Sequence, residues 1–176
     1  MALVVLLRGV NVGGHRTFRP SLLAEELGRF GVVNIGAAGT FVVRRPVAQT
    51  HLRDELTRRL PFDARIMICQ GREIAGLISR NPFERQPLRP DMVRFVTVLS
   101  RRPRAEPSMP FSVPSSGRWL LRILARRGRF VFGLYRRHMK AISHLGTIDR
   151  LFGVPATTRN WNTLTAIARV LETRGS

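Results

Sequence analysis

The order of apolar runs along the chain predicts an α+β fold built from two lobes. Over the first half, runs of strand length alternate with helix-periodic segments in the order β-α-β-β-α-β. A polar stretch with two prolines at residues 84–90 then reads as a linker, and a glycine-centred hairpin dominates the second half. We therefore expect a ferredoxin-like, split β-α-β lobe over residues 1–83. A smaller lobe of antiparallel hairpin plus helices would cover residues 92–176, and the two could pack as one compact unit.

The first lobe divides into four strands and three helices. Short apolar runs predict strands at residues 3–7, 32–35, 40–43 and 64–69. Apolar side chains at helical spacing predict helices at residues 20–30, 46–60 and 72–79. Proline in the first turn and glycine after the last favour the boundaries of the first helix. Cys69 lies in the last apolar run, where a buried packing role is expected.

The second lobe is expected to begin with a strand at residues 92–99, followed by a loop at 101–117 that holds four prolines. Two strands at residues 119–126 and 129–136 flank Arg127-Gly128, a two-residue turn in which glycine can adopt positive φ. Helices near residues 143–152 and 160–172 complete the lobe.

Charge is the unusual feature of the composition. The 176 residues include 30 Lys+Arg and 11 Asp+Glu, which gives a net charge of +19, and all basic residues but Lys140 are arginine. Such one-sided use of arginine is typical of a GC-rich genome, but it does not explain the shortage of acids. Residues 91–176 alone carry 16 basic and 4 acidic residues, a net of +12. The excess indicates either a polyanion-binding surface or a solvated face.

Composition also excludes several classes of protein. A single cysteine excludes a disulfide framework and a multi-cysteine zinc site. No apolar run approaches the ~20 residues of a membrane span, and the apolar start is too short for a signal peptide. We therefore expect a cytoplasmic protein that does not contact membranes.

The predicted hairpin gives the first candidate site. With its turn at Arg127-Gly128, cross-strand partners have residue numbers that add to 255, and one face becomes an arginine-rich surface. Guanidinium groups suit phosphate, and a tyrosine can stack on a base, so this surface is a candidate for nucleic-acid binding. The alternative is that the arginines extend into water, and a slip of one residue would exchange the faces. The surface comprises Arg118, Arg122, Arg126, Arg129, Tyr135 and Arg137.

A glycine-rich loop and a motif near the other end give the second candidate site. The loop follows the first strand and could form an anion nest, although its spacing fits neither a Walker loop nor a dinucleotide fingerprint. The motif precedes the last helix, whose free N–H groups attract anions. The alternatives are a loop that only reverses the chain and a helix cap with Trp161 in the core. The residues are Arg8, Asn11, Gly13, Gly14, His15, Arg16, Arg159, Asn160 and Asn162.

Three segments together resemble a bacterial family called Domain of Unknown Function 1697. They are the opening LLRGVNVGG at residues 6–14, the element ISRNPF at 78–83 and the closing ATTRNWNTLT at 156–165. The resemblance implies a compact α+β protein with a ferredoxin-like N-terminal part and no established reaction. Its signature residues here are Arg8, Gly9, Asn11, Gly13 and Gly14 at the first end, and Arg159, Asn160, Asn162 and Thr163 at the second.

This chain departs from the family pattern in three places, one of which is that the family's Ser-Lys-Leu element before the penultimate helix has no clean match, with Lys140 nearby but displaced. Ala37-Ala38-Gly39-Thr40 stands where relatives tend to have Gln-Ser-Gly-Asn, and His15-Arg16 follows the double glycine where a lysine is usual. If the Gln-Ser-Gly-Asn turn helps to bind a ligand in relatives, that role is weakened or changed in this chain.

The candidate catalytic residues are sparse, which favours a binding function over an enzymatic one. The acids lie mostly in predicted helices, and the four histidines show no metal-ligand spacing. We expect no cofactor and no metal, and an anionic partner such as nucleic acid. The alternative is a small-molecule-binding protein or enzyme acting on a phosphorylated or carboxylated metabolite between the glycine loop and the closing motif. A third is an acidic protein partner, and the oligomeric state is left open.

Overall fold

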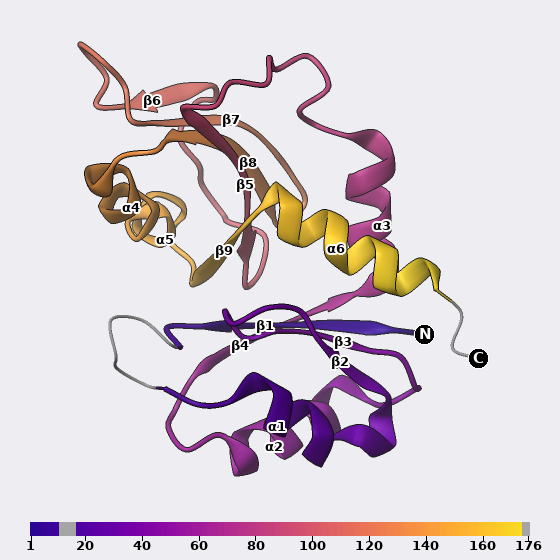
Figure 1. The fold of residues 1–176 in the computed structure, drawn as a ribbon. Coiled ribbons are helices and arrows are strands. Elements are labelled where there is room, and N and C mark those ends of the chain that lie inside the picture. The colour runs from indigo at the N-terminus through magenta and orange to yellow at the C-terminus, as the bar shows by residue number, and fades with distance from the viewer. Residues whose placement is uncertain (11–16, 174–176) are drawn as a thin grey trace. The chain divides into compact units, whose positions relative to one another are not determined.

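The computed structural model describes residues 1–10 and 17–173. This part of the chain forms a mixed α+β protein with two antiparallel sheets and six α-helices (Figure 1). It divides into two compact units, which are described separately. Unit 1 comprises Met1–Arg80 and Thr163–Ser176, and unit 2 comprises Asn81–Asn162. We expected residues 92–176 to form one lobe, but the last segment groups with the first unit.

The sheet of unit 1 is built around an apolar central strand. Its strands are β1 (Leu3–Arg8), β2 (Val32–Asn34), β3 (Thr40–Val43) and β4 (Arg65–Gln70), in the order β2-β3-β1-β4. β1 pairs antiparallel with β3 and β4, and its residues from Leu3 to Leu7 are all buried. An apolar run without polar alternation predicts this burial of both strand faces. Cys69 of β4 is fully buried, as expected.

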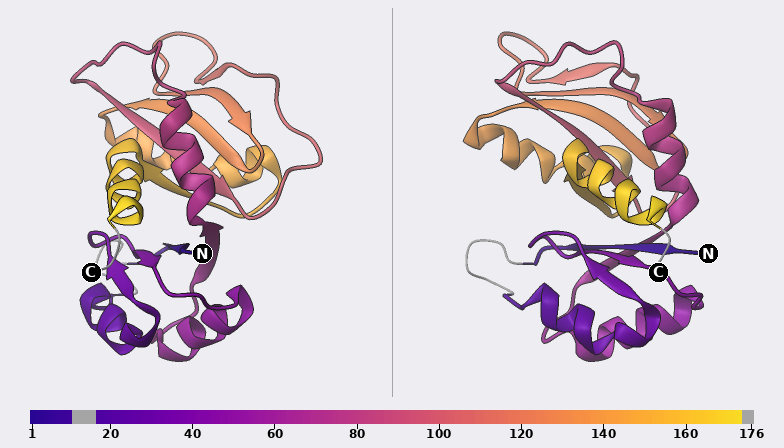
Figure 2. Two further views of the ribbon diagram at one scale, coloured as in Figure 1. Left: turned by 90° about the vertical axis from the view of Figure 1, so that its right-hand side faces the viewer. Right: turned by 45° about the vertical axis from the view of Figure 1, so that its right-hand side comes forward.

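Two helices cover one face of this sheet, as Figures 1 and 2 show. They are α1 (Pro20–Glu26), which is followed by the 3-10 turn η1 (Gly28–Phe30), and α2 (Gln49–Arg59). The predicted helix at residues 20–30 is interrupted at Leu27, and Gly31 closes the 3-10 turn with a left-handed φ of 64°. α2 begins three residues later than predicted because Ala48 is extended.

The ends of unit 1 include two further helices. α3 (Gly71–Arg80) follows β4 directly, and α6 (Trp161–Glu172) begins at the end of unit 2 and continues into unit 1. Arg44 of unit 1 donates to the carbonyl of Val170 (3.3 Å) and to Oγ1 of Thr173 (2.9 Å). These bonds tie the C-terminal end of α6 to the segment after β3.

The sheet of unit 2 has the order β6-β7-β8-β5-β9 and is antiparallel throughout. Helices α4 (Met139–Leu145) and α5 (Ile148–Phe152) pack against the core on one face through Leu145, Ile148 and Phe152. The short strands β6 and β9 were not predicted from the sequence. The strands are β5 (Met92–Leu99), β6 (Phe111–Val113), β7 (Leu121–Arg127), β8 (Phe130–Arg136) and β9 (Ala156–Asn160).

The hairpin of β7 and β8 is present, but its predicted register is wrong, by two residues next to the turn, where Ala125 pairs with Phe132 instead of Phe130, and by one residue beyond a bulge. The turn consists of Gly128 and Arg129, and Leu121 pairs with Tyr135 instead of Leu134. The physical reason is that Gly128, with a φ of 59°, occupies the first turn position, which shifts the pairing by two residues, and a bulge at Leu124 then reduces this shift to one. The five arginines consequently do not share one outward face: Arg122 lies opposite Leu134, whereas Arg126 lies opposite Val131.

Close packing at Gly133 fixes how β8 sits against β5. A methyl group at this position would lie 2.6 Å from Cε1 of Phe95 and 2.7 Å from the carbonyl oxygen of Arg122. Phe95 is fully buried and cannot move aside without displacing the core of unit 2. Only glycine therefore fits opposite Phe95.

We predict that Gly133→Ala destabilises the protein by roughly 1–3 kcal/mol, because overpacking displaces the aromatic ring. The measurement is urea denaturation followed by circular dichroism. Gly76→Ala in α3 is the matched control, since nothing lies within 4 Å of the added methyl group. That change should leave stability unaltered or raise it by about 0.5–1 kcal/mol. Equal denaturation midpoints for Gly133→Ala and the parent protein would contradict the packing argument.

Candidate functional site

Charged side chains gather at three places in the described residues. One is a cluster around the buried Glu55 in unit 1. The other two are neighbouring depressions in unit 2, which we call the groove and the basic hollow.

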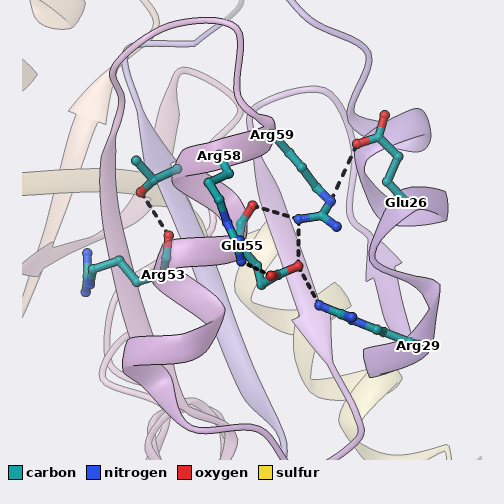
Figure 3. Close-up of polar contacts among 7 residues, drawn as sticks. Glu26, Arg29, Arg53, Glu55, Arg58 and Arg59 are labelled. Carbon is teal, nitrogen blue, oxygen red and sulfur yellow. Dashed lines mark hydrogen bonds and ion pairs between the residues drawn. The ribbon is translucent and has the colours of Figure 1, made fainter.

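The Glu55 cluster joins η1 to α2 (Figure 3). The Glu55 side chain is only 5% exposed. Its Oε2 lies 2.6 Å from a guanidinium nitrogen of Arg29 and 2.6 Å from one of Arg59, and its Oε1 accepts from Arg58. Arg59 also lies 3.8 Å from a carboxylate oxygen of Glu26 in α1. One carboxylate thus organises three guanidinium groups.

The electrostatics of Glu55 favour a structural role. Burial alone would raise the pKa of this carboxyl, but the charges of Arg29, Arg58 and Arg59 together lower its pKa below the ordinary 4.5. Glu55 is therefore ionised at neutral pH, and both of its oxygens are engaged. A general acid or base needs a pKa near the working pH, so we assign this residue to stability.

The groove has a volume of about 530 Å³ and lies entirely within unit 2. It lies where β5 begins and where its neighbours β8 and β9 end. Two aromatic side chains, three arginines and two asparagines contribute to its walls. They are Tyr135, Trp161, Arg89, Arg94, Arg137, Asn160 and Asn162.

Contacts with neighbouring residues fix the orientation of side chains in the groove. Arg94 donates to the carbonyl of Gln86 (2.7 Å), and Arg137 donates through Nε to the carbonyl of Pro90 (2.9 Å). The ring of Trp161 packs edge-on against Phe83, with ring centroids 5.1 Å apart. A carbonyl oxygen is a neutral acceptor, so both guanidiniums keep their full charge while their positions are restricted.

Tyr135 lies in a half-buried environment beside one of these arginines. Its ring packs against Phe95, with centroids 5.8 Å apart. Burial raises the pKa of its hydroxyl, and the charge of Arg137 partly opposes this effect. The resulting pKa lies above the ordinary value of 10.0. The phenol is therefore neutral at physiological pH and presents a ring with a polar edge.

The basic hollow, of about 310 Å³, adjoins the groove through a shared residue. Arg137 lines both depressions. Asp91 is the acidic residue of the hollow, and its carboxylate lies 3.1 Å from Arg136 and 3.4 Å from Arg89. The lining residues are Asp91, Arg118, Leu120, Arg136, Arg137, His138 and Lys140.

The arginines predicted on the hairpin surface have separate environments. Arg126 forms an ion pair with Glu106, which lowers the pKa of that carboxyl chiefly through the hydrogen bond. Arg122 donates to Ser112 Oγ (3.0 Å) and lies 4.3 Å from the ring centroid of Trp119. Arg129 belongs to the turn, 5.7 Å from the ring of Phe130.

From the same predicted set, Arg118 lines the hollow, Tyr135 lines the groove and Arg137 lines both. The sequence did not predict the contributions of Arg89 and Arg94. Arg94 lies in β5 and Arg89 lies just before it. The sequence shows that both arginines are in or next to a predicted strand, but it does not show that β8 and β9 pair with this strand and complete the groove.

The closing motif is divided between the groove and the interior. Asn160 and Asn162 line the groove, together with Trp161. Arg159 lies in β9 opposite Val96, is only 8% exposed, and donates to Thr157 Oγ1 and the Thr158 carbonyl at 2.9 Å each. Burial lowers the pKa of its guanidinium to about 10, which leaves it charged at neutral pH. Arg159 is therefore an interior residue in the strand that leads to the groove.

The glycine-loop half of the second candidate site lies mostly outside the described residues. This applies to Asn11, Gly13, Gly14, His15 and Arg16. Arg8 ends β1 in unit 1 and pairs across the sheet with Arg65. A shared site between this loop and the closing motif therefore stays a prediction.

Within residues 1–10 and 17–173, no group of three His, Cys, Asp or Glu side chains could hold a metal ion. Over the same ranges, none of the helices has both the length and the apolar character needed to cross a membrane.

Comparison with known proteins places the chain in a family. The model of a family described as "Protein of unknown function (DUF1697)" matches residues 1–118. The chain belongs to this family. The match covers the strands of unit 1 together with β5 and β6, and it ends before the hairpin. Among proteins with curated descriptions, none matched the chain.

A solved structure shares the fold. It is described as conserved bacterial protein SP0830 from Streptococcus pneumoniae, and it superposes with a TM-score of 0.60 at 16% sequence identity. The alignment covers 97% of this chain and 98% of that chain. At this identity the likeness concerns the arrangement of helices and strands in the two-sheet α+β fold.

We predict that Glu55→Gln destabilises the protein at neutral pH, because three guanidiniums lose their shared anion. The pKa of Glu55 is lower in the folded than in the unfolded state, so its stabilising effect is present above about pH 4.5 and is lost as the pH falls below it. The difference in denaturation midpoint between parent and variant should therefore shrink in acid. Glu25→Gln removes the same charge from an exposed position and is the control. A difference that stays constant with pH would contradict the assignment.

Proposed function

We propose that the groove binds single-stranded nucleic acid, with a base stacked on an aromatic ring and phosphates held by arginine. The observation that supports this is the convergence of two separate motifs on one groove. Tyr135 and Arg137 come from the end of the hairpin, and Asn160 and Asn162 come from the closing motif. The pairing of β5 with both β8 and β9 brings them together.

The chemistry of the walls fits this class of ligand. Arginine can hold phosphate oxygens in pairs, and an exposed aromatic ring stacks on a base with about 1–3 kcal/mol per base. Asparagine amides can donate to and accept from the edges of unpaired bases. None of the described residues that line the groove is acidic, so nothing on its walls repels a phosphate. Its volume of about 530 Å³ is within the usual range for ligand pockets.

A single strand fits better than a duplex because stacking on Tyr135 or Trp161 requires an exposed base face. In a duplex that face is covered by neighbouring bases, and recognition would then depend on groove edges and backbone. The side chains that line the groove support binding and positioning, and they suggest no nucleophile with an adjacent base. A phosphorylated metabolite in the same groove is the alternative ligand.

We also assign unit 1 to the ferredoxin-like class. The support is its antiparallel strand order, β2-β3-β1-β4, with α1 and α2 in the two connections between β1 and β2 and between β3 and β4.

We predict that the protein binds labelled oligothymidylate and that Tyr135→Leu weakens binding by roughly 5- to 150-fold, the equivalent of one stacked base. Tyr135→Phe keeps the ring and should bind like the parent protein. Fluorescence anisotropy over a salt series is the measurement, because each phosphate contact contributes about −0.7 to the slope of log K against log salt for a single strand.

Two results would overturn the proposal. One is no binding to oligothymidylate at low salt. The other is equal affinity of Tyr135→Leu, Tyr135→Phe and the parent protein, which would show that the ring of Tyr135 does not contribute to binding. Circular dichroism of both variants verifies that unit 2 remains folded.

A further inference from the structure

We infer that the groove and the basic hollow are consecutive parts of one binding path, so that the ligand is a chain of several nucleotides. Its base would occupy the groove, and its backbone would pass Arg137 into the hollow. This inference rests on the proposed function and extends it from the class of ligand to its length and course.

The first argument is the position of Arg137 on the shared wall. It follows β8 directly, and its side chain lines both depressions. Its backbone N–H donates to the carbonyl of Asp91 and its Nε to the carbonyl of Pro90, both at 2.9 Å. These two bonds restrict the guanidinium at the boundary without neutralising its charge. A backbone phosphate at this boundary would contact the same arginine from either side.

The second argument is the charge of the hollow. Arg118, Arg136, Arg137 and Lys140 contribute four positive charges, against the single carboxylate of Asp91. That carboxylate is already engaged by Arg136, and also by Arg89 from the groove. The hollow therefore keeps a large positive excess, which favours an anion with several charged groups.

The third argument is the division of chemistry between the two depressions. Tyr135 and Trp161 are the aromatic residues that line the groove, whereas His138 is the ring residue that lines the hollow. The Nδ1 of His138 accepts a hydrogen bond from the backbone N–H of Lys140 (3.1 Å), so this nitrogen faces its own chain. Phosphate contacts position a nucleic acid, and ring contacts bind its bases. The hollow fits the first kind of contact, and the groove fits the second.

One arginine of the hollow, Arg136, also contacts an aromatic residue, Trp119. Arg136 donates through Nε to the carbonyl of Trp119 (2.8 Å), and its guanidinium lies 4.3 Å from the Trp119 ring centroid. Trp119 and Trp161 are the two tryptophans of the chain, so each depression has one tryptophan in or beside it. Fluorescence can therefore report on the two depressions separately.

The experiment compares thymidine 5′-monophosphate with oligothymidylates of increasing length. We expect affinity to rise at least about tenfold with length, and the salt slope to grow by about 0.7 for each added phosphate contact. The double variant Arg118→Gln/Lys140→Gln should lose this gain but bind the mononucleotide like the parent protein. The matched control is Arg101→Gln/Arg102→Gln, which removes two charges from exposed positions of the same unit.

Single-tryptophan variants give an independent measurement. In Trp119→Phe, the fluorescence of Trp161 should change with both the mononucleotide and the oligonucleotide. In Trp161→Phe, the fluorescence of Trp119 should change with the oligonucleotide alone, because only a longer chain reaches Arg136. A Trp119 response to the mononucleotide equal to that of Trp161 would overturn the order of the path.

The outcomes separate this inference from the function on which it rests. Mononucleotide and oligonucleotide binding of equal affinity, unaffected by Arg118→Gln/Lys140→Gln, would overturn the path and leave the groove intact. Absence of binding to either would overturn the proposed function. Polyglutamate that binds as tightly as the oligonucleotide and depends equally on Arg118 and Lys140 would overturn both, in favour of an acidic protein partner.

Discussion

The excess of guanidinium groups over carboxylates is the constraint on which the polar structure of this protein depends. With 30 basic and 11 acidic residues, the carboxylates are too few to pair one to one with the basic side chains. Carboxylates are consequently shared: Glu55 contacts three arginines and Asp91 contacts two. Other arginines are anchored on backbone carbonyls, as Arg53 is on Ile66 at 2.7 Å. Arginine suits this use because its five N–H donors allow one bond to a carbonyl while others face elsewhere.

The two kinds of anchor have opposite consequences for binding. At Glu55 and at Glu106, a carboxylate pairs with arginine and joins secondary structure elements or a loop. At Arg94 and Arg137, a carbonyl positions the guanidinium and leaves its charge unchanged. Both of these arginines line the groove, and Arg137 also lines the hollow, so charge remains where the walls are concave. Net charge alone does not distinguish these cases, whereas the hydrogen-bond partners do.

Local patterns predicted most elements of the fold, and pairing between distant segments explains the failures. The apolar run at residues 92–99 gave β5 with its observed bounds, since a buried strand is encoded by its own sequence. β9 was mistaken for a helix cap because Thr157, Thr158 and Asn160 are polar and precede a helix. This strand forms through its pairing with β5, 61 residues away, where the hydroxyls of Thr97 and Thr158 lie 2.7 Å apart. A window along the sequence does not contain that partner.

The candidate site shows the same division between local and distant information. Tyr135 and Arg137 were selected for an outward face that the bulge and the glycine turn abolish, and Asn160 and Asn162 were selected for a site with the glycine loop. They line one groove because β5 lies between the two strands, where Val93 pairs with Tyr135 and Phe95 pairs with Asn160. The family match ends at residue 118. β5 and the segment before it therefore come from the matched region, whereas β8, β9 and their ring and amide side chains lie beyond it. The matched region thus supplies β5 and two of the groove arginines, Arg89 and Arg94, and the segments beyond it supply Arg137 and the ring and amide side chains.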